Sequence, residues 1–467
     1  MEEKNKGINI SAKSFVTAIL TILILMILTY VLTLILPGGE YVRVPDANGN
    51  MVISADSEFR TAESGLPFWK WLLSPFLVLG ADGSAALIAV IFFLLVLGGA
   101  FNALTEYGLM NYMLKKIVSR FGAVRYRLML ILIFFFMAIG SLVGSFEEVV
   151  PLVPIVVSLA VALGWDALTG IAMSLLAVGC GFAAGVANPF TIGVAQTLTG
   201  LPMFGGIWLR LLSFVLIYGL LSGFVVLHAK RVEKGQGAAD APGAFEKDPR
   251  MDAGLRVFGI LLAVGIALIL SSAFIAALRD YTMIIVALMF LAAGIASTLT
   301  AGMKGKELGR SFLKGVIAVS PSVLMILMAS SIRYTMVEGH ILDTLLHFAV
   351  TAAGGLSAAG AVLFVYLICL IMNFFIPSGS AKAFLLIPLI VPLAGMFGIS
   401  AQLCIVAFAF GDGFSNVFYP TNPVLLISLG LADVSYGKWA RYSLKFQAAN
   451  LLLTCGILLF GLAVGYA

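Results

Sequence analysis

Long runs of apolar residues, separated by short polar connections, recur along nearly the whole chain. The first run, Phe15–Leu36, contains 22 residues and no charge, and a helix needs about 20 apolar residues to span a membrane. Because this run is too long for the apolar core of a signal peptide, we expect it to be a retained helix. Further apolar segments, each predicting a helix, cover residues 84–105, 128–143, 149–163, 167–187, 190–199, 203–227, 257–276, 281–301, 316–337, 357–376, 383–398, 401–418, 423–435 and 442–466.

Two pairs of these segments, 128–143 with 149–163 and 357–376 with 383–398, are joined by short tips. The tips read GSFEE and SGSAK, and small residues permit a tight turn. We interpret each pair as a re-entrant helical hairpin that enters the membrane and returns to the same side. The helix that begins at each tip presents free N–H groups, which favour an anion.

Two further segments are interrupted by an Asn-Pro pair, Asn188-Pro189 in GVANPFT and Asn422-Pro423 in YPTNPVL. Each pair predicts a broken helix, because proline lacks an N–H donor and strains the preceding turn. Irregular backbone at membrane depth is tolerated only where protein or a water-filled cavity supplies hydrogen-bond partners. The two tips and the two breaks therefore predict a polar site inside the membrane.

The composition supports a membrane protein. Of all residues, 61% are hydrophobic and 11% are charged, whereas a soluble domain has about 25% charged residues. The four cysteines are scattered among apolar runs, which indicates neither a disulfide framework nor a metal site. Most Lys and Arg residues fall in loops that are cytoplasmic if the N-terminus is cytoplasmic. We therefore expect a cytoplasmic N-terminus, an extracytoplasmic C-terminus and no nucleic-acid partner.

The chain also contains an internal repeat. A shift of 234 residues, followed by a three-residue gap, brings these landmarks into register: Gly179 with Gly413, Asn188-Pro189 with Asn422-Pro423, and Trp208-x-Arg210 with Trp439-x-Arg441. The charge pattern places Arg210 outside and Arg441 inside, and the two hairpins open to opposite sides. The halves are therefore expected to be inverted, an organisation in which transporters bind solutes and ions near the membrane midplane.

Four charged residues lie in or near these irregular segments. Glu147 and Glu148 could cap the helix at the first tip, but intramembrane charges are usually functional. We favour a role for at least one of them in carrying a proton or pairing with a cationic solute. Lys382, which aligns with Glu148, could pair with Glu148 or extend to the interface. Asp412, in FGDGF, could bind an ion or make structural hydrogen bonds.

The polar residues at the tips and breaks form the expected site. The residues expected to bind the solute are Ser145, Glu147, Glu148, Asn188, Thr191, Ser378, Gly379, Ser380, Asn416, Thr421 and Asn422. The residues expected to bind a coupling ion are Gly144, Ser145, Asn188, Ser378, Asp412, Thr421 and Asn422. We expect Na⁺ or H⁺ as the coupling ion, no cofactor, and no metal beyond sodium.

Four segments carry a resemblance to a known family. They read GSFEEVVPLVPIVVSLAVALGWD, ANPFTIGVAQ, SGSAKAFLLIPLIVPLAGMFGIS and GDGFSNVFYPTNPVLL. These segments resemble the YfcC/DcuC family, also called the C4-dicarboxylate anaerobic carrier family, within the ion transporter superfamily. Members of the YfcC-like branch are described as basic amino acid antiporters, and other branches carry four-carbon dicarboxylates or short fatty acids. The resemblance implies a homodimer with a scaffold domain and a moving transport domain, working as an elevator.

We therefore predict an all-α integral membrane protein with an inverted-repeat ion-transporter-superfamily fold, two re-entrant hairpins and two broken helices. The expected domains are scaffold helices 1–127 with an extracytoplasmic loop at 37–65, a first transport-domain repeat at 128–228, a cytoplasmic linker at 229–256, second-half scaffold helices 257–356, and a second transport-domain repeat at 357–467.

The predicted function is secondary active transport of a carboxylate-bearing metabolite, with an amino acid favoured over a C4-dicarboxylate or short-chain carboxylate. The expected location is the bacterial inner membrane. An ion channel is the alternative from another class, although paired inverted hairpins without a continuous polar stripe favour alternating access. An enzyme is not expected, because all three histidines lie away from the tips.

Overall fold

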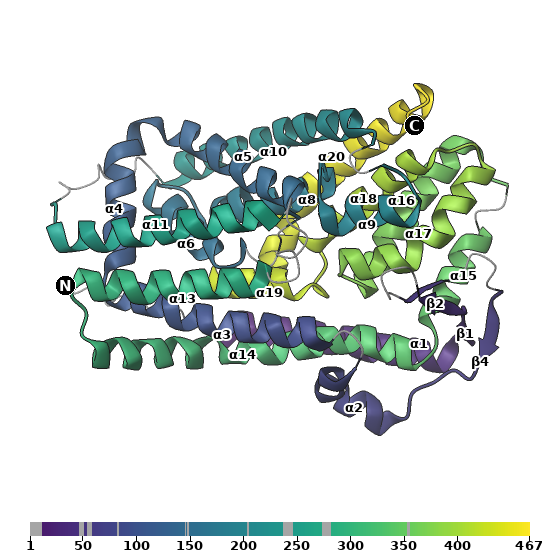
Figure 1. Cartoon of the computed structure of the whole chain (residues 1–467), viewed down its shortest axis with the longest axis horizontal. Helices are drawn as coiled ribbons and strands as arrows, with labels where there is room; N and C mark the ends of the chain where they lie inside the picture. Colours follow the sequence, from purple (N-terminus) through teal and green to yellow (C-terminus); the bar gives the residue numbers. More distant parts are fainter. Residues whose placement is uncertain are drawn as a thin grey trace.

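The computed structural model of the chain is almost entirely helical (Figure 1). It describes residues 12–45, 51–53, 58–81, 84–144, 146, 149–202, 205–236, 246–272, 282–352 and 355–467. Within these residues, ten helices are long and apolar enough to cross a membrane.

The first half of the chain contains helices of very different lengths. They are α1 (Ala12–Ile35), α2 (Phe68–Leu77), α3 (Ser84–Glu106), α4 (Leu109–Phe121), α5 (Arg125–Leu142), α6 (Leu152–Ala162), α7 (Ala167–Ile171), α8 (Ala177–Ala184), α9 (Val194–Leu198) and α10 (Ile207–Gln236), with 3-10 turns at Val78–Gly80 and Gly122–Val124. Two π-helical segments, Ala172–Leu176 and Pro189–Gly193, lie beside the short helices of the first break.

The second half follows a similar order of long and short helices. It contains α11 (Pro249–Ser272), α13 (Thr282–Ala301), α14 (Gly305–Glu338), α15 (Leu342–Ala352), α16 (Ala358–Phe375), α17 (Gly379–Met396), α18 (Ala401–Asn416), α19 (Pro423–Leu431) and α20 (Tyr436–Ala463). The helices flank both predicted tips and both Asn-Pro interruptions, as the apolar runs indicated.

The helices form two packed groups (Figure 1). In the first group, α3 packs on α14 and α13, with α1 against α14 and α11 against α13. In the second group, α5 packs on α8, α16 packs on α18, and α8 crosses α18 at the centre. Nearly every residue of α8 and α18 is buried, so the elements that carry the breaks form the core of the second group.

The crossing of α8 and α18 depends on two glycines that align in the repeat. A Cβ atom on Gly413 would lie 2.4 Å from Ala183 Cα, and one on Gly179 would lie 2.5 Å from Val417 Cγ1. Ala183 and Val417 also align at the same spacing. The contacts are therefore reciprocal, as they are when two equivalent surfaces meet around a two-fold axis.

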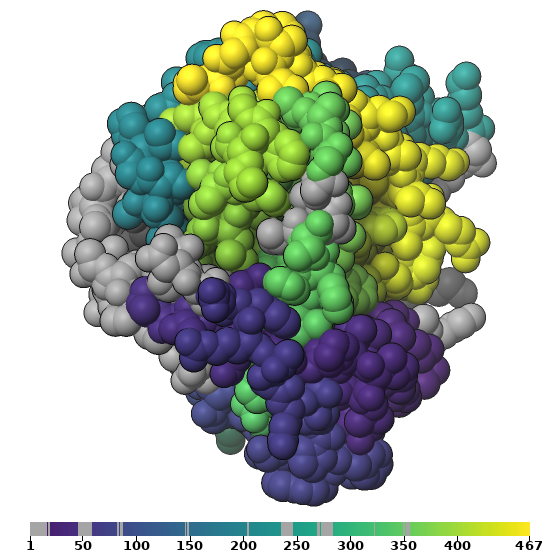
Figure 2. All heavy atoms as spheres, turned by 90° about the vertical axis from the view of Figure 1, so that its right-hand side faces the viewer, coloured from purple at the N-terminus to yellow at the C-terminus, as the bar shows by residue number. Residues whose placement is uncertain are grey.

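The segment 37–65, expected to be a loop, contains four short strands instead. β1 (Gly38–Glu40) pairs antiparallel with β4 (Arg60–Ala62), and β2 (Arg43–Pro45) pairs antiparallel with β3 (Met51–Ile53). The Tyr41 N–H donates to Asp343 of α15 over 2.9 Å. Figure 2 shows this end of the molecule, with the N-terminal segments in purple below green segments of the second half. Tertiary contact with α15, and not a local sequence signal, accounts for the order of this segment.

Two further features differ from the sequence interpretation. Helix α14 begins at Gly305, well before the apolar segment at 316–337, because its first turns are amphipathic. Arg210, expected on the exterior side, lies at the start of α10 with an exposure of 1% and donates to the Gly205 carbonyl over 2.9 Å. Its buried position was not predicted from the sequence.

Candidate functional site

The second tip places a lysine in the core. The Lys382 N–H donates to the Ser378 carbonyl over 3.0 Å, which fixes Lys382 in the first turn of α17. Its side chain is 0% exposed, and Nζ donates to Asp412 Oδ1 of α18 over 2.5 Å and also to Asn373 Oδ1 of α16. Lys382 therefore does not extend to the interface. Desolvating two charges is tolerated when the pair is close and its remaining groups are hydrogen-bonded.

Asn373 is oriented by three acceptors on α18. Its Nδ2 donates to Ser415 Oγ over 2.7 Å, to Asn416 Oδ1 over 2.9 Å and to the Asp412 carbonyl over 3.1 Å. Because the amide nitrogen is engaged by these acceptors, the amide oxygen faces Lys382. Asn373 thus connects the ion pair to the C-terminal end of α18.

The network continues to the second break. Asn422 Nδ2 donates to Asn416 Oδ1 over 3.0 Å, and Asn422 Oδ1 accepts from the Val424 N–H over 2.9 Å. Asn422 is therefore the N-cap of α19, with Pro423 in the first turn, where its missing N–H leaves no hydrogen bond unmade. A continuous set of hydrogen bonds joins the second tip to the second break.

The first break is built in a similar way. Asn188 Oδ1 accepts from the N–H groups of Phe190, over 2.9 Å, and Thr191, over 3.3 Å. Gly144 at the first tip has φ of 74°, and a Cβ there would lie 2.2 Å from Asn188 Oδ1. Only glycine meets both the backbone conformation and the close approach. The first tip therefore lies directly on the first break.

The two halves meet at Gly379, the first residue of α17. A Cβ on Gly379 would lie 2.6 Å from Asp412 Oδ2 and 2.7 Å from Thr191 Cγ2. Thr191 belongs to the first break, whereas Asp412 and Gly379 belong to the second half. This contact between the halves is thus flanked by a carboxylate and a hydroxyl-bearing side chain.

Several buried polar atoms of this region have no hydrogen-bond partner among the residues that the structure describes. They are Asn188 Nδ2, Thr191 Oγ1, Asp412 Oδ2 and Thr421 Oγ1. Buried polar groups are almost always hydrogen-bonded, and an exception calls for an explanation such as a bound ion, water or ligand. These atoms comprise one donor, one acceptor and two hydroxyl groups.

The structure brings many of the predicted site residues together. Gly144, Asn188, Thr191, Gly379, Asp412, Asn416, Thr421 and Asn422 all lie in the region of the two tips and two breaks. Ser378 is exposed at the start of α17 and Ser380 is half-buried. Ser145, Glu147 and Glu148 lie outside the described residues.

Two residues of the network, Asn373 and Ser415, were absent from the sequence-based set, and Lys382 was not assigned to the site. The signal for Asn373 is an amide in the apolar run LICLIMNFF, since polar residues within a membrane helix usually mark functional positions. The partner of Lys382 could not be deduced, because it lies 30 residues away on another helix.

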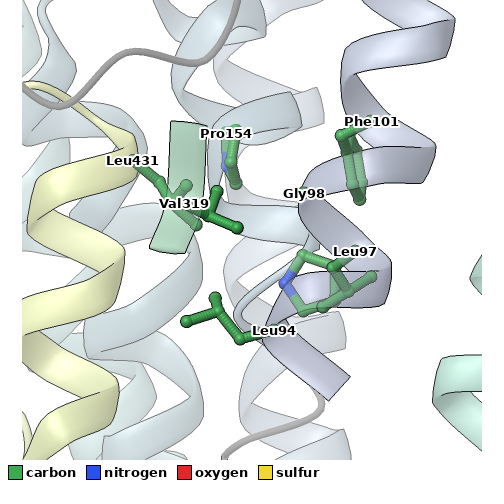
Figure 3. A pocket seen from close by; sticks show the side chains of 8 residues that line it. Leu94, Leu97, Gly98, Phe101, Pro154, Val319 and Leu431 are labelled. Atoms are coloured by element: carbon green, nitrogen blue, oxygen red, sulfur yellow. The ribbon is translucent and has the colours of Figure 1, made fainter. Parts of the chain in front are cut away.

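A separate small pocket lies between α3, α14, α6 and the end of α19 (Figure 3). Its lining comprises Leu94, Leu97, Gly98, Phe101, Pro151, Pro154, Val319 and Leu431. A solute site usually contains a few polar groups that fix the orientation of the ligand. Because its lining side chains are apolar, this pocket does not qualify as the site of a polar metabolite.

Comparisons with known proteins agree with a transporter. Residues 15–463 match the family model described as C4-dicarboxylate anaerobic carrier, DcuC. A protein of Escherichia coli named "Putative basic amino acid antiporter YfcC" is 28% identical over 402 residues, which cover 81% of this chain and 78% of that protein.

Two solved structures are similar at lower identity. The YdaH transporter of Alcanivorax borkumensis has a TM-score of 0.46 and 19% identity, covering 97% of this chain and 99% of that one. MtrF of Neisseria gonorrhoeae, reported with a class of antimetabolite efflux pumps, has a TM-score of 0.45 and 19% identity, covering 94% of each chain.

Proposed function

This chain belongs to the C4-dicarboxylate anaerobic carrier family, and from that premise we propose that it is a secondary active transporter of a carboxylate-bearing metabolite. The family and the ten apolar helices make the chain a multi-pass membrane protein. We place it in a bacterial inner membrane with its N-terminus cytoplasmic and its C-terminus extracytoplasmic, on the distribution of Lys and Arg among the loops.

The proposed mechanism is alternating access between two inverted halves. It is supported by the aligned tips and breaks and by the reciprocal contacts of Gly179 and Gly413. In inverted-repeat transporters, substrate and ion sites are built from broken helices where the repeats meet. Gly379, with Thr191 and Asp412 beside it, is such a meeting point.

The observation that carries the proposed site is a set of buried atoms, at the two breaks and at that meeting point, that have no hydrogen-bond partner among the described residues: Asn188 Nδ2, Thr191 Oγ1, Asp412 Oδ2 and Thr421 Oγ1. At the start of α17 the N-cap Ser378 makes no side-chain hydrogen bond, so the N–H groups there can attract a carboxylate. Asp412 Oδ2 and the Thr191 hydroxyl are suited to accept from an amino group. Both kinds of partner together favour a solute with a carboxylate and an amino group.

We therefore propose an amino acid as the solute, moved by exchange or with Na⁺ or H⁺. A basic amino acid agrees with the name given to the Escherichia coli relative, and Glu147 or Glu148 would balance its second positive charge. A C4-dicarboxylate is the second candidate because the family description names it. The unpartnered Asp412 oxygen disfavours a solute with two negative charges.

We also propose that the two packed groups of helices move relative to each other as in an elevator, within a homodimer. The apolar pocket of Figure 3 lies between α3 and α14 on one side and α6 and α19 on the other. A seam with apolar walls and incomplete packing presents few hydrogen bonds to break during sliding. This arrangement supports movement of α6 and α19 past α3 and α14.

The test is counterflow into proteoliposomes that contain the purified chain. Vesicles are loaded with unlabelled arginine, an amino acid without a second charge, or succinate, and uptake of the labelled external solute is measured. We expect saturable counterflow with an amino acid, which the Asn188→Ala/Asn422→Ala double variant abolishes. Counterflow only with succinate would indicate that the solute is a dicarboxylate and not an amino acid. An ohmic current without saturation would indicate a channel.

A further inference from the structure

The ammonium group of Lys382 lies in an oxygen-lined position that does not depend on the lysine for its shape. Its Nζ contacts Asp412 Oδ1, over 2.5 Å, and Asn373 Oδ1, and it lies 6.0 Å from the centre of the Phe408 ring. A carboxylate oxygen and an amide oxygen are the ligand types that hard cations prefer, and an aromatic face adds attraction for a positive charge.

The amide oxygen of Asn373 is held in place by other groups. Asn373 Nδ2 donates to Ser415 Oγ, Asn416 Oδ1 and the Asp412 carbonyl, and none of these acceptors belongs to Lys382. With the lysine removed, Asn373 Oδ1 would therefore still face this point, beside the carboxylate of Asp412. Asp412 Oδ2, which has no partner among the described residues, would be free to act as a further ligand.

We propose that this position is a monovalent-cation site of the transport machinery that Lys382 fills permanently with a tethered ammonium group. The second half then needs no soluble cation at this point, and any ion coupled to transport binds elsewhere. The two halves are chemically unequal here, because the residue aligned with Lys382 is Glu148.

This inference deepens the proposed function, since it concerns the ions that the transporter uses. Its test measures cation binding in detergent solution without any transport step. A failure of the transport proposal in the counterflow assay and a failure of this inference are therefore separate outcomes.

The experiment compares the thermal unfolding of four purified proteins: the native chain, Lys382→Ala, Lys382→Met and the Lys382→Ala/Asp412→Asn double variant. Each protein is heated in sodium chloride and in choline chloride at equal ionic strength, over a series of concentrations. Lys382→Ala vacates the site, Lys382→Met fills the space without a charge, and the double variant removes the anionic ligand.

We expect Lys382→Ala to gain a midpoint increase in sodium over choline that exceeds any sodium effect on the native chain. The increase should grow with the logarithm of the sodium concentration, as for a ligand that binds only the folded state. Lys382→Met and the double variant should show no such gain. If the ion pair were purely structural, Lys382→Ala and Lys382→Met would show the same sodium response.

Three results would overturn the proposal. One is a Lys382→Ala protein with the same sodium response as the native chain. Another is an equal gain in Lys382→Met, which would place sodium binding outside the vacated position. The third is a Lys382→Ala protein that fails to fold to the same extent in sodium chloride and in choline chloride. A preformed cation site should accept sodium in place of the lysine.

Discussion

The two breaks of the molecule use the same residue pair but differ in how completely their polar groups are satisfied. At the second break, Asn422 caps α19 with its oxygen and donates its amide nitrogen to Asn416. At the first break, Asn188 makes the equivalent cap, but its amide nitrogen has no partner among the described residues. The amide nitrogen of Asn422 is therefore hydrogen-bonded within the second half, whereas that of Asn188 is an unused donor in the part of the chain that the structure describes.

This difference indicates a division of labour between the halves. In the second half, hydrogen bonds connect Lys382, Asn373 and Asn416 to Asn422. In the first half, we propose that a solute uses the open groups of Asn188 and Thr191. Substitutions of hydrogen-bonded residues in the second half should therefore act on stability as well as on transport, whereas Asn188 and Thr191 should affect mainly solute binding.

The largest effect is expected at the buried ion pair. Lys382→Met leaves Asp412 buried without a counter-charge, and breaking such a pair typically costs about 3–5 kcal/mol. The Lys382→Met/Asp412→Asn double variant should recover a large part of that loss. Unfolding of the purified proteins in denaturant measures the loss of stability in Lys382→Met and its recovery in the double variant.

The matched control is the exposed pair of Lys314 and Glu106, with Nζ 2.7 Å from Oε1. Exposed ion pairs are worth about 0–1 kcal/mol, and Lys314→Met should be nearly neutral. Equal losses for Lys382→Met and Lys314→Met would mean that the network of the second half does not stabilise the fold.

The next largest effect is a difference in stability loss between alanine substitutions of the two glycines at the crossing of α8 and α18. The added methyl of Gly413→Ala meets the backbone of Ala183, whereas that of Gly179→Ala meets the side chain of Val417. Overpacking costs about 1–3 kcal/mol, and a side chain can shift more easily than a backbone. Gly413→Ala should therefore be the more destabilising change. A larger loss for Gly179→Ala in the same unfolding assay would contradict the described crossing.

A smaller loss of stability is expected at the helix caps, with a clear effect on transport. Removing an N-cap side chain typically costs about 1 kcal/mol. The loss of stability should be larger for Asn422→Ala than for Asn188→Ala, because Asn422→Ala also removes the hydrogen bond to Asn416. Both should lose counterflow, but only Asn188→Ala should do so while keeping nearly native stability. Unchanged counterflow in Asn188→Ala would place the solute elsewhere.

The smallest effect concerns the caps at the far ends of the broken helices. Asp166 caps α7 by accepting from the Thr169 N–H over 2.9 Å, and the aligned Ser400 caps α18 by accepting from the Leu403 N–H over 3.1 Å. Burial would raise the pKa of Asp166, but hydrogen bonds from His228 and Thr169 outweigh this and lower its pKa to about 2.

A carboxyl with a lowered pKa in the folded state stabilises the fold above its ordinary pKa, and this contribution is lost as the pH falls. The native chain should therefore lose stability between about pH 4 and pH 2 more steeply than Asp166→Ser, whose cap does not titrate. Parallel pH profiles of the thermal midpoint would show that Asp166 makes no such contribution.

The apolar pattern predicted the helices, tips and breaks because these features are local. A long uncharged run specifies a helix by its length alone, and Asn-Pro specifies a break and a cap by the chemistry of two residues. The two Asn-Pro pairs were predicted to interrupt helices, and in the structure Asn188 and Asn422 each cap the helical segment that follows the break.

Features that depend on distant partners could not be predicted in the same way. The strands of segment 37–65 are held by Asp343, which is 302 residues away from Tyr41. The burial of Arg210 follows from tertiary packing, and its aligned counterpart Arg441 is exposed. The pairing of Lys382 with Asp412 requires α17 and α18 to be placed in space.

The central claim is that a solute binds where the open groups of the first half meet Gly379. The most direct test is an experimental structure of the chain with an amino acid for which counterflow has been measured. We expect density for the amino group within hydrogen-bond distance of Asp412 Oδ2 and the Thr191 hydroxyl, with the carboxylate at the N-terminus of α17. Solute density in the apolar pocket between α3 and α6, with Thr191 and Asp412 uncontacted, would contradict it.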